Sequence, residues 1–275
     1  MTEKKETIRF TKMHGIGNDY VYVDLDRYPI RDLPAFAIKA SDRHFGIGGD
    51  GVVTYNRESD DLYRMRIFNT DGSEGLMCGN AIRCVAKLIY EGGLLHRNPL
   101  RIVTASGLKT LELTLDGEDR MTLARVDMGK PVVVDDDFRV EIPEAVYVGT
   151  KVSVGNPHYV VFIDEEPEDY PLDRLGPKVE RHELFPERVN FEIVRLTDPH
   201  TLRMRVYERG SGLTLACGTG ACASAVAAIH HGRAVSPVTV RMPGGDLKIE
   251  WDGTPEGSVY MTGPAEIAFT GEIEA

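Results

Sequence analysis

Two cysteines stand in closely similar surroundings in the two halves of the chain. Cys78 follows the run Met65-Arg66-Ile67-Phe68, and Cys217 follows Met204-Arg205-Val206-Tyr207 at the same separation. A glycine and then an apolar, helix-like run come after each cysteine. The positive end of a helix dipole favours a thiolate and lowers the pKa of a cysteine. Two such cysteines on opposite sides of one stereocentre could remove a proton from one face and return a proton to the other.

The residues after the cysteines are suited to binding a carboxylate. Gly79-Asn80 and Gly218-Thr219 would open the two helices, where backbone N–H groups bind anions and glycine permits close approach. Proton removal from an amino acid normally uses pyridoxal phosphate, but the chain has no P-loop and no compelling Schiff-base lysine. We therefore expect no cofactor, and a water-poor site that closes over the substrate.

The cysteines do not predict a metal site or a disulfide framework. The spacings Cys78-x5-Cys84 and Cys217-x4-Cys222 differ from the C-x2-C of zinc knuckles. Free cysteine is among the most buried residue types, and a structural role is the usual one for an isolated cysteine. We expect that role for Cys84 and Cys222, which lie within apolar helical faces. For Cys78 and Cys217, the repeat and the position at a helix start favour a chemical role over a structural one.

An internal repeat extends beyond the cysteines. Gly17-Asn18-Asp19-Tyr20 resembles Gly155-Asn156-Pro157-His158, and Leu108-Lys109 lines up with Leu247-Lys248. Corresponding positions lie 138 to 140 residues apart along the chain. We predict two homologous domains, the first made of residues 1–125 with 264–275 and the second of residues 126–263.

Hydrophobic periodicity indicates strands around two principal helices. Alternating patterns predict strands at 20–25, 111–115, 139–142, 202–207, 238–242 and 247–251, and a last strand at 266–269 that returns to the first domain. Helices are predicted at 80–91, with Arg83, Lys87 and Glu91 on the polar face, and at 220–231, apolar all round and hence buried. A shorter helix is expected at 33–42. The fold class predicted is α+β, with two pseudo-symmetric domains, each a mostly antiparallel or mixed sheet wrapped around a central helix, and an active site in the interdomain cleft.

Composition restricts the class of protein. The chain has 275 residues, 42% hydrophobic and 27% charged, as in soluble globular proteins. The net charge of −11, without a basic cluster, argues against nucleic-acid binding. No apolar stretch is long enough to span a membrane, and the polar residues 1–6 do not resemble a signal peptide. We expect a cytoplasmic protein.

At these residues the chain resembles the diaminopimelate epimerases. The motifs that carry the resemblance span residues 15 to 220 and are the stretches at 15–19, 43–51, 68–73, 77–84, 155–158, 188–191, 207–210 and 216–220. The resemblance implies conversion of LL-2,6-diaminopimelate to the meso form, without pyridoxal phosphate, for lysine and peptidoglycan synthesis. It also implies a homodimer, for which Phe269 is the candidate interface aromatic.

The resemblance implies specific roles for the residues that match. Cys78 and Cys217 would be the acid/base pair, and His158 and Glu208 would tune their pKa values. The implied substrate-binding residues are Asn18, Asn69, Gly79, Asn80, Asn156, Asn190, Glu208, Arg209, Gly218 and Thr219. Independently, Arg209 could bind a carboxylate with two hydrogen bonds and Glu208 could pair with an ammonium group. Gly51 stands where some relatives have glutamine, so that contact is not expected here.

Two other readings stay open. A proline racemase or hydroxyproline epimerase shares the fold and the two cysteines, but typically has Cys-Gly-His where this chain has Cys78-Gly79-Asn80. A small-molecule-binding or redox-sensing protein could also carry two reactive thiols. Exchange of the substrate α-hydrogen with solvent separates an enzyme from a binder.

Overall fold

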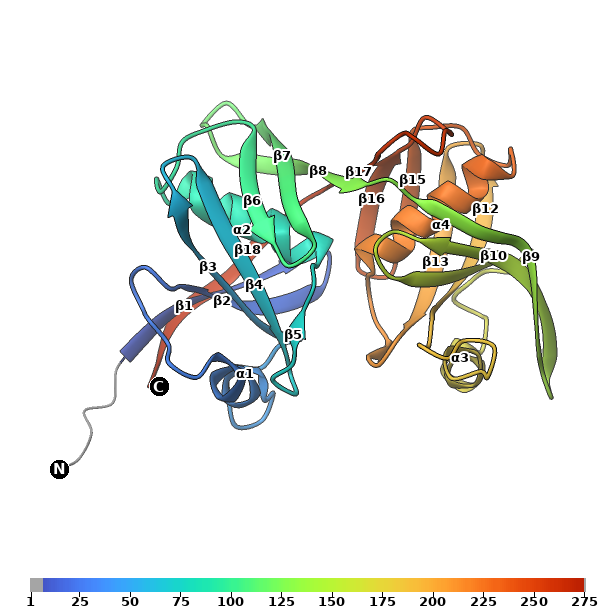
Figure 1. Cartoon of the computed structure of the whole chain (residues 1–275), viewed down its shortest axis with the longest axis horizontal. Helices are drawn as coiled ribbons and strands as arrows, with labels where there is room; N and C mark the ends of the chain where they lie inside the picture. The colour runs from blue at the N-terminus through green and yellow to red at the C-terminus, as the bar shows by residue number, and fades with distance from the viewer. Residues whose placement is uncertain (1–6, 275) are drawn as a thin grey trace. The chain divides into compact units, whose positions relative to one another are not determined.

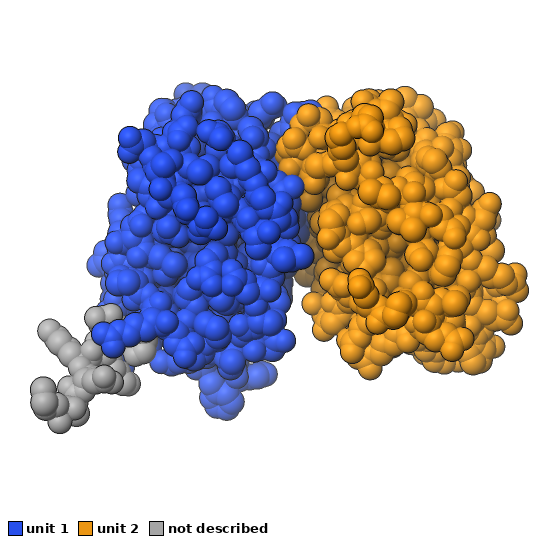
Figure 2. Space-filling view, in the orientation of Figure 1, with its two compact units in different colours: residues 1–126, 263–275 blue, residues 127–262 orange. Residues whose placement is uncertain are grey.

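The computed structural model describes residues 7–274 and divides the chain into two compact units. The first comprises residues 1–126 and 263–275, and the second comprises residues 127–262 (Figures 1 and 2). The boundaries expected from the repeat differ from these by one residue. Residues 1–6, whose polar composition bears on the signal-peptide expectation, lie outside the described part. None of the helices in residues 7–274 has the length and apolar character needed to cross a bilayer.

The first unit is built on a mixed sheet. Its elements are β1 (Thr7–Gly15), β2 (Asn18–Asp24), α1 (Leu33–Ser41), β3 (Gly51–Ser59), β4 (Leu62–Asn69), β5 (Glu74–Gly75), α2 (Gly79–Glu91), β6 (Leu100–Thr104), β7 (Gly107–Leu115), β8 (Met121–Gly129, which runs into the second unit) and β18 (Glu266–Glu274). Strand pairs β1–β2, β3–β4, β6–β7 and β7–β8 are antiparallel, whereas β2–β3 and β4–β6 are parallel. The last strand, β18, pairs antiparallel with β1, which confirms the expected return to the first domain.

The second unit repeats this arrangement. Its elements are β9 (Val132–Ile142), β10 (Ala145–Ser153), β11 (Pro157–Phe162), α3 (Leu172–Glu180), β12 (Asn190–Asp198), β13 (Thr201–Glu208), β14 (Gly212–Leu213), α4 (Gly218–His230), β15 (Val238–Met242), β16 (Gly245–Glu250) and β17 (Val259–Gly263). Here β11–β12 and β13–β15 are the parallel pairs, in the same places as β2–β3 and β4–β6. The mixed α+β architecture predicted from the sequence is therefore confirmed.

The two halves also match in detail. Strands β3 and β12 have the same succession of buried and exposed residues over nine positions. Helices α2 and α4 each have 13 residues and begin directly after a cysteine. Helix α2 packs against β1 and β2 of its unit, and α4 packs against six strands of the second unit, β10 to β13, β15 and β16 (Figure 1). Both helices are largely buried. A buried helix cannot shift without disrupting the sheet around it, so the residues at its start are rigidly held.

Two expectations about helices were wrong. Arg83 was placed on the polar face of its helix, but it is fully buried, where its guanidinium donates to the carbonyl oxygens of Gly79 and Pro264 and to the Asn80 side chain. Helix α3 was not predicted, because Gly176 and Pro177 interrupt its pattern. A side chain at position 176 would come within 2.6 Å of Tyr207, so glycine there permits close packing against β13.

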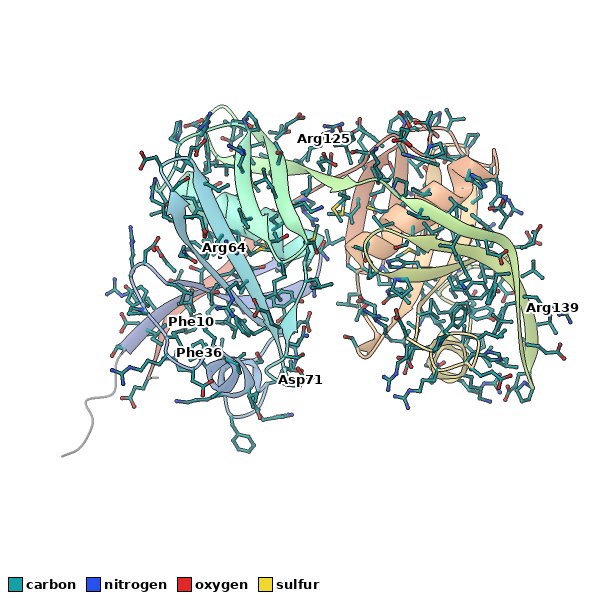
Figure 3. All side chains as sticks on the ribbon, viewed as in Figure 1. Phe10, Phe36, Arg64, Asp71, Arg125 and Arg139 are labelled. Atoms are coloured by element: carbon teal, nitrogen blue, oxygen red, sulfur yellow. The ribbon has the colours of Figure 1, made fainter. Side chains whose placement is uncertain are left out.

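One hydrophobic core of the first unit lies between its sheet and α1. Phe10 of β1 and Phe36 of α1, both labelled in Figure 3, are buried there with Val21, Val23 and Phe68. Pro34 in the first turn and an Asp32 side chain that accepts from the Ala35 N–H begin helix α1. This core holds β2 and β3 in register, and so fixes the loop ends that carry Asn18 and Asp50.

Candidate active site

Cys78 is the N-cap residue of α2. Its backbone is extended (φ −134°, ψ 120°), and its Sγ accepts a hydrogen bond from the Ala81 N–H at 3.5 Å. The thiol also donates to Asn18 Oδ1 at 3.3 Å. The helix itself provides no acceptor for the N–H groups of Gly79 and Asn80. The start of α2 thus combines a half-buried thiol with backbone donors suited to an anion.

A network of charges holds Asn18. Its Nδ2 donates to Asp50 Oδ2 at 2.8 Å, and the same oxygen accepts from the Asp19 N–H at 3.1 Å. Arg43 donates to both carboxylates, and the buried Lys12 ammonium lies 2.6 Å from Asp19 Oδ2. Burial raises the pKa of Asp19, but hydrogen bonds from Arg43 and Lys12 outweigh this, so its pKa lies below the usual value. Asp19 therefore stays ionised.

The turn between β1 and β2 brings Asn18 to this place. Ile16 (φ 51°) and Gly17 (φ 87°) both have positive φ, as in the tight hairpin turns that match the twist of a sheet. Asn18 begins β2 directly after this turn. Sequence analysis named Asn18 but missed Asp50, which orients it.

The other residues predicted in the first unit have different surroundings. Asn80 is buried, and its Oδ1 accepts a hydrogen bond from the Arg83 guanidinium at 2.9 Å, so its side chain has a structural role. Asn69 is exposed at the end of β4 and donates through Nδ2 to Ser73 Oγ at 2.9 Å, in the turn that contains Asp71 (Figure 3). Within this unit, the contacts described join Cys78 to Asn18, while Asn69 belongs to that turn.

Cys217 is the N-cap residue of α4 and is more deeply buried than Cys78. It is 5% exposed, and its Sγ lies 3.6 Å from Thr219 Oγ1. Burial raises the pKa of the Cys217 thiol well above its usual value, and the charges of Glu208 and Glu192 add to this. The Thr219 hydroxyl acts in the opposite direction. The expectation that the helix start lowers this pKa is wrong for Cys217, because desolvation and two carboxylates outweigh the dipole.

A chain of polar side chains leads from Cys217 into the unit. Asn156 donates through Nδ2 to Thr219 Oγ1 at 3.3 Å, and its Oδ1 lies 3.0 Å from His158 Nε2. His158 Nδ1 lies 2.6 Å from Glu192 Oε1, and both of these side chains are completely buried. The strand register explains the contact between His158 and Glu192. Parallel strands β11 and β12 set Val160 opposite Glu192, and His158, two residues earlier in β11, lies on the same face of the sheet. These hydrogen bonds bring three predicted residues, Asn156, His158 and Thr219, together with Cys217.

Among these hydrogen-bonded side chains, Glu192 is the one that the sequence analysis did not name. It stands between Phe191 and Ile193 on a strand whose first five residues are all buried. A charged residue in such a strand needs a partner, because burying an unpaired charge is very costly. That requirement was a signal available in the sequence.

The remaining predicted residues lie at the start of β12 and at the end of β13. Asn190 donates to the Pro157 carbonyl at 2.9 Å and accepts from the Arg209 N–H at 3.0 Å, so it links three segments of backbone. Glu208 accepts from the Thr214 hydroxyl and acts on the pKa of Cys217. The Arg209 guanidinium is exposed, with one contact to the Glu187 carbonyl at 3.3 Å.

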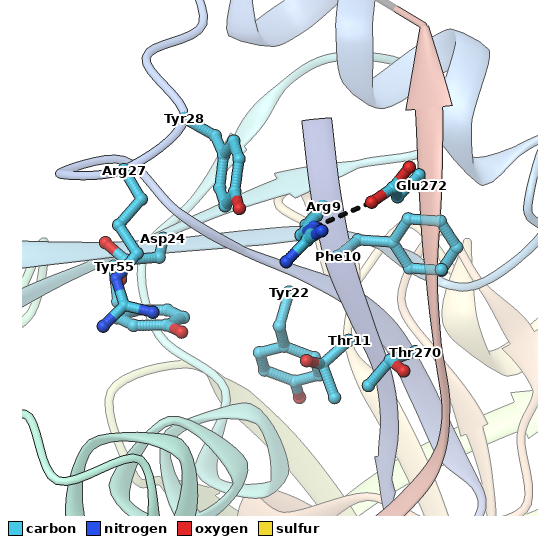
Figure 4. Close-up of a pocket in the computed structure, with 11 residues that line it drawn as sticks. Arg9, Phe10, Thr11, Tyr22, Asp24, Arg27, Tyr28, Tyr55, Thr270 and Glu272 are labelled. Carbon is cyan, nitrogen blue, oxygen red and sulfur yellow. Dashed lines mark hydrogen bonds and ion pairs between the residues drawn. The ribbon is translucent and has the colours of Figure 1, made fainter. Parts of the chain in front are cut away.

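A pocket of about 480 Å³ lies elsewhere on the first unit and includes none of the predicted site residues (Figure 4). It is lined by β1, β2 and β18, and its Arg9 is paired with Glu272 at 2.7 Å. The polar residues around the cysteines, rather than this pocket, form the candidate site.

Known structures place the fold among racemases, epimerases and their relatives. The chain superimposes on a phenazine biosynthesis protein of the PhzF family from Bacillus anthracis with a TM-score of 0.77 at 16% identity, covering 98% of this chain and 100% of the other. A hydroxyproline epimerase from Agrobacterium vitis matches with a TM-score of 0.73 at 14% identity, covering 100% and 94%. At these identities the likeness defines the fold alone.

Sequence comparison defines the family. The Diaminopimelate epimerase family model matches residues 10–134 and 150–268. The diaminopimelate epimerase of Acetivibrio thermocellus is 47% identical, with 97% of this chain and 99% of that protein covered. The enzyme of Parabacteroides distasonis is also 47% identical, covering 98% and 99%. The chain belongs to the diaminopimelate epimerase family and is an isomerase, which confirms the resemblance drawn from the motifs.

Proposed function

We propose that this protein converts LL-2,6-diaminopimelate to the meso form with Cys78 and Cys217 as its two acid/base groups. The observation that carries the proposal is the repeated arrangement, in a member of this family, of a cysteine at the N-cap of a buried 13-residue helix. The two units would close on one substrate molecule, each contributing one sulfur atom.

The reaction needs only proton transfers. One cysteine, as the thiolate, takes the α-hydrogen, and the electron pair of the broken C–H bond is left on the α-carbon and spreads into the adjacent carboxylate. The other cysteine, as the thiol, gives its proton to the opposite face of the same carbon. The chirality is inverted, and the two cysteines have exchanged protonation states. The two cysteines carry both proton transfers and no redox change occurs; we propose that the enzyme works without a cofactor.

The carboxylate at the reacting carbon would bind at the helix starts. Gly79 and Asn80 in one unit, and Gly218 and Thr219 in the other, offer backbone N–H groups for which their helices supply no acceptor. Hydrogen bonds and helix dipoles that stabilise the growing negative charge lower the barrier to proton removal. We propose that this replaces the electron sink that pyridoxal phosphate supplies in other enzymes.

Charged and amide groups would bind the rest of the substrate. The Arg209 guanidinium is suited to the distal carboxylate, and Glu208 to an ammonium group. Asn18, Asn69, Asn156 and Asn190 are the proposed amide contacts. Asn69 and Asn190 would have to share or exchange their present hydrogen bonds with Ser73 and with the Pro157 and Arg209 backbone. His158 and Glu208 are the proposed groups that adjust the cysteine pKa values.

Exchange of the α-hydrogen tests the proposal. In D₂O the wild-type protein should convert LL-diaminopimelate to the meso form and introduce deuterium at the α-carbon. Cys78→Ala and Cys217→Ala should each lower turnover by roughly 10²–10⁴-fold, the contribution typical of a general acid or base. Cys84→Ala is the matched control and should retain turnover.

Three results would contradict the proposal. Near-normal turnover in either single active-site variant would exclude two-base catalysis. Exchange with proline or hydroxyproline but not with diaminopimelate would favour the proline racemase reading. Binding of diaminopimelate without any exchange would favour a binding protein.

We further propose a cytoplasmic homodimer that binds neither nucleic acid nor membranes. The net charge of −11 supports the absence of nucleic-acid and membrane contacts. Phe269 supports an interface on β18, because its side chain is half exposed. Its ring centroid lies 6.0 Å from that of Phe10, in an edge-to-face arrangement.

A further inference from the structure

Glu192 forms a buried pair with His158, and the proposed reaction gives Glu192 itself no role. Their 2.6 Å contact joins two side chains with no exposed surface, and Glu192 Oε2 has no hydrogen-bond partner among the described residues. The pair lies under the first turn of α4. A side chain at Gly220 would come within 2.8 Å of Glu192 Oε1 and 3.3 Å of Cys217 Sγ. Glycine at 220 is thus needed for the carboxylate to approach the helix start beside Cys217.

The pair determines which atom of His158 carries a proton. If Glu192 is ionised and His158 is an imidazolium, Nε2 is an N–H donor. If Glu192 is protonated and donates to Nδ1, Nε2 is again the N–H. The third arrangement, an ionised Glu192 with a proton on Nδ1 alone, leaves a net negative charge in the interior and points the bare Nε2 at Asn156 Oδ1. The uncompensated buried charge disfavours this arrangement, whichever end of the Asn156 amide faces Nε2.

The proton on Nε2 in turn orients Asn156. Its Oδ1 accepts from Nε2, so its Nδ2 must point the other way, where it donates to Thr219 Oγ1 at 3.3 Å. The Thr219 oxygen then accepts, and its hydroxyl hydrogen is free to point toward Cys217 Sγ, 3.6 Å away. Every hydrogen bond from His158 Nε2 to the sulfur therefore runs in one direction.

The first unit orients its equivalent asparagine by a different group and in the opposite sense. At the spacing of the repeat, Tyr20 and Val52 stand where the second unit has His158 and Glu192, and they cannot form such a pair. Instead Asp50 holds the Nδ2 of Asn18, so Oδ1 accepts from Cys78. The two cysteines thus meet opposite ends of an amide: Cys78 meets the acceptor directly, and Cys217 meets the donor end through Thr219.

We propose that Glu192 is a positioning residue that, through His158, fixes Asn156 with its amide NH₂ toward Thr219, Cys217 and the bound substrate. The inference rests on the proposed function for the catalytic role of Cys217. The orientation of the Asn156 amide depends only on contacts within the second unit. Glu192 acts by selecting a donor at Nε2, and contacts neither substrate nor the reacting carbon.

Glu192→Gln is the sharpest substitution, because it keeps the size of the side chain. A glutamine amide can pair with either neutral tautomer of His158, so Nε2 becomes a donor only part of the time. We expect kcat/KM to fall by roughly 10- to 100-fold, as for loss of a charge-assisted hydrogen bond. Ser224→Ala removes a buried hydroxyl from α4, where Ser224 donates to Met204, and should leave kcat/KM within about twofold.

A double-mutant cycle separates positioning from general damage. In a His158→Gln background, Glu192→Gln should change kcat/KM by less than about twofold, because the residue that Glu192 acts through is gone. The same 10- to 100-fold loss in both backgrounds would overturn the proposal. So would a wild-type rate in the single Glu192→Gln variant.

A second measurement needs no substrate and reads the wild-type protein, with a variant used only for assignment. Nitrogen-15 spectra of the wild-type imidazoles at pH 7.5, with the His158 signals assigned by their loss in His158→Gln, report directly on Nε2. We expect a protonated Nε2, and a bare Nε2 would overturn the proposal. Because this result does not involve diaminopimelate, it stays valid if the proposed substrate is wrong.

Discussion

At the scale of single residues, carboxylates behind the expected asparagines set the chemistry that those asparagines offer. An amide presents a donor at one end and an acceptor at the other, and its neighbours decide which end meets the substrate or the sulfur. In the first unit the deciding neighbour of Asn18 is Asp50, which can only accept while ionised. The Asn18 oxygen is therefore committed to the Cys78 thiol.

Asp50→Ala tests this commitment. Without the carboxylate, the Asn18 amide can rotate and the thiol loses its fixed acceptor, so we expect kcat/KM to fall about tenfold. Iodoacetamide labelling of Cys78 at constant pH should also speed up, since a hydrogen bond that holds the thiol form is lost. Asp116→Ala removes a turn carboxylate of the same unit, which accepts from the Glu118 and Arg120 N–H groups, and should change neither rate. Unchanged rates in Asp50→Ala would show that Asn18 is oriented by other means.

The residue scale also shows what sequence reasoning could reach. Cys78, Cys217 and the residues after them were predictable because a duplicated cysteine at a helix start is a local pattern. Asp50 and Glu192 were not singled out, because their partners lie 32 and 34 positions away in the chain. Their importance depends on strand register, which parallel pairing sets and local sequence does not.

At the scale of elements, the two helices are fixed by burial. Helix α2 carries Cys84 on its buried face, and burial raises the pKa of the Cys84 thiol to about 12. Its neighbour Arg83 satisfies three acceptors inside the unit. The helix that presents Cys78 is thus held by both apolar packing and a buried guanidinium.

The raised pKa of Cys84 predicts a loss of stability in alkali. Above about pH 9 the thiol ionises in the unfolded chain but stays protonated in the folded protein, so the unfolded state binds fewer protons. The free energy of unfolding therefore falls between about pH 9 and 12, by about 1.4 kcal/mol per pH unit from this group. Chemical denaturation at pH 8 and pH 10.5 measures the fall.

Cys84→Ala should reduce this pH dependence. The variant should be less stable at pH 8, by roughly 1–2 kcal/mol for the lost apolar contacts, and should lose less stability on going to pH 10.5. Equal losses in the variant and the wild type would mean that Cys84 does not contribute to alkaline unfolding.

Helix prediction failed where tertiary contacts override local preference. Arg83 is polar and lies at helical spacing from Lys87 and Glu91, so an outward position was expected. Its burial is possible because acceptors from residues 79, 80 and 264 converge on it, and Pro264 comes from the far end of the chain. Helix α3, with Gly176 and Pro177 inside it, forms because it packs on β13 next to Tyr207.

At the scale of the whole molecule, the proposed homodimer depends on the exposed surface of β18. Phe269 is 50% exposed on β18, whose side chains are mostly exposed. Light scattering after size-exclusion chromatography should give twice the mass of one chain. Phe269→Glu should give the mass of one chain, because an interface core does not accept an unpaired charge.

Phe45→Glu is the matched control for the dimer. Phe45 is 94% exposed on the first unit, so the same substitution there adds the same charge and should leave the mass unchanged. A wild-type protein that runs as a single chain at tens of micromolar would contradict the proposal. Dissociation by both variants would point to a general effect of charge.

The sequence by itself determined the family, the mixed α+β architecture and the two helices that begin after cysteines. These depend on hydrophobic periodicity and on short motifs, both of which are local or repeated along the chain. The tertiary structure alone decided that Cys217 is buried beside carboxylates, that Glu192 lies under the start of α4, and that the two equivalent asparagines are held by opposite ends. The physical reason is that pKa values and hydrogen-bond direction depend on desolvation and on neighbours across parallel strands, which residues far apart in sequence supply.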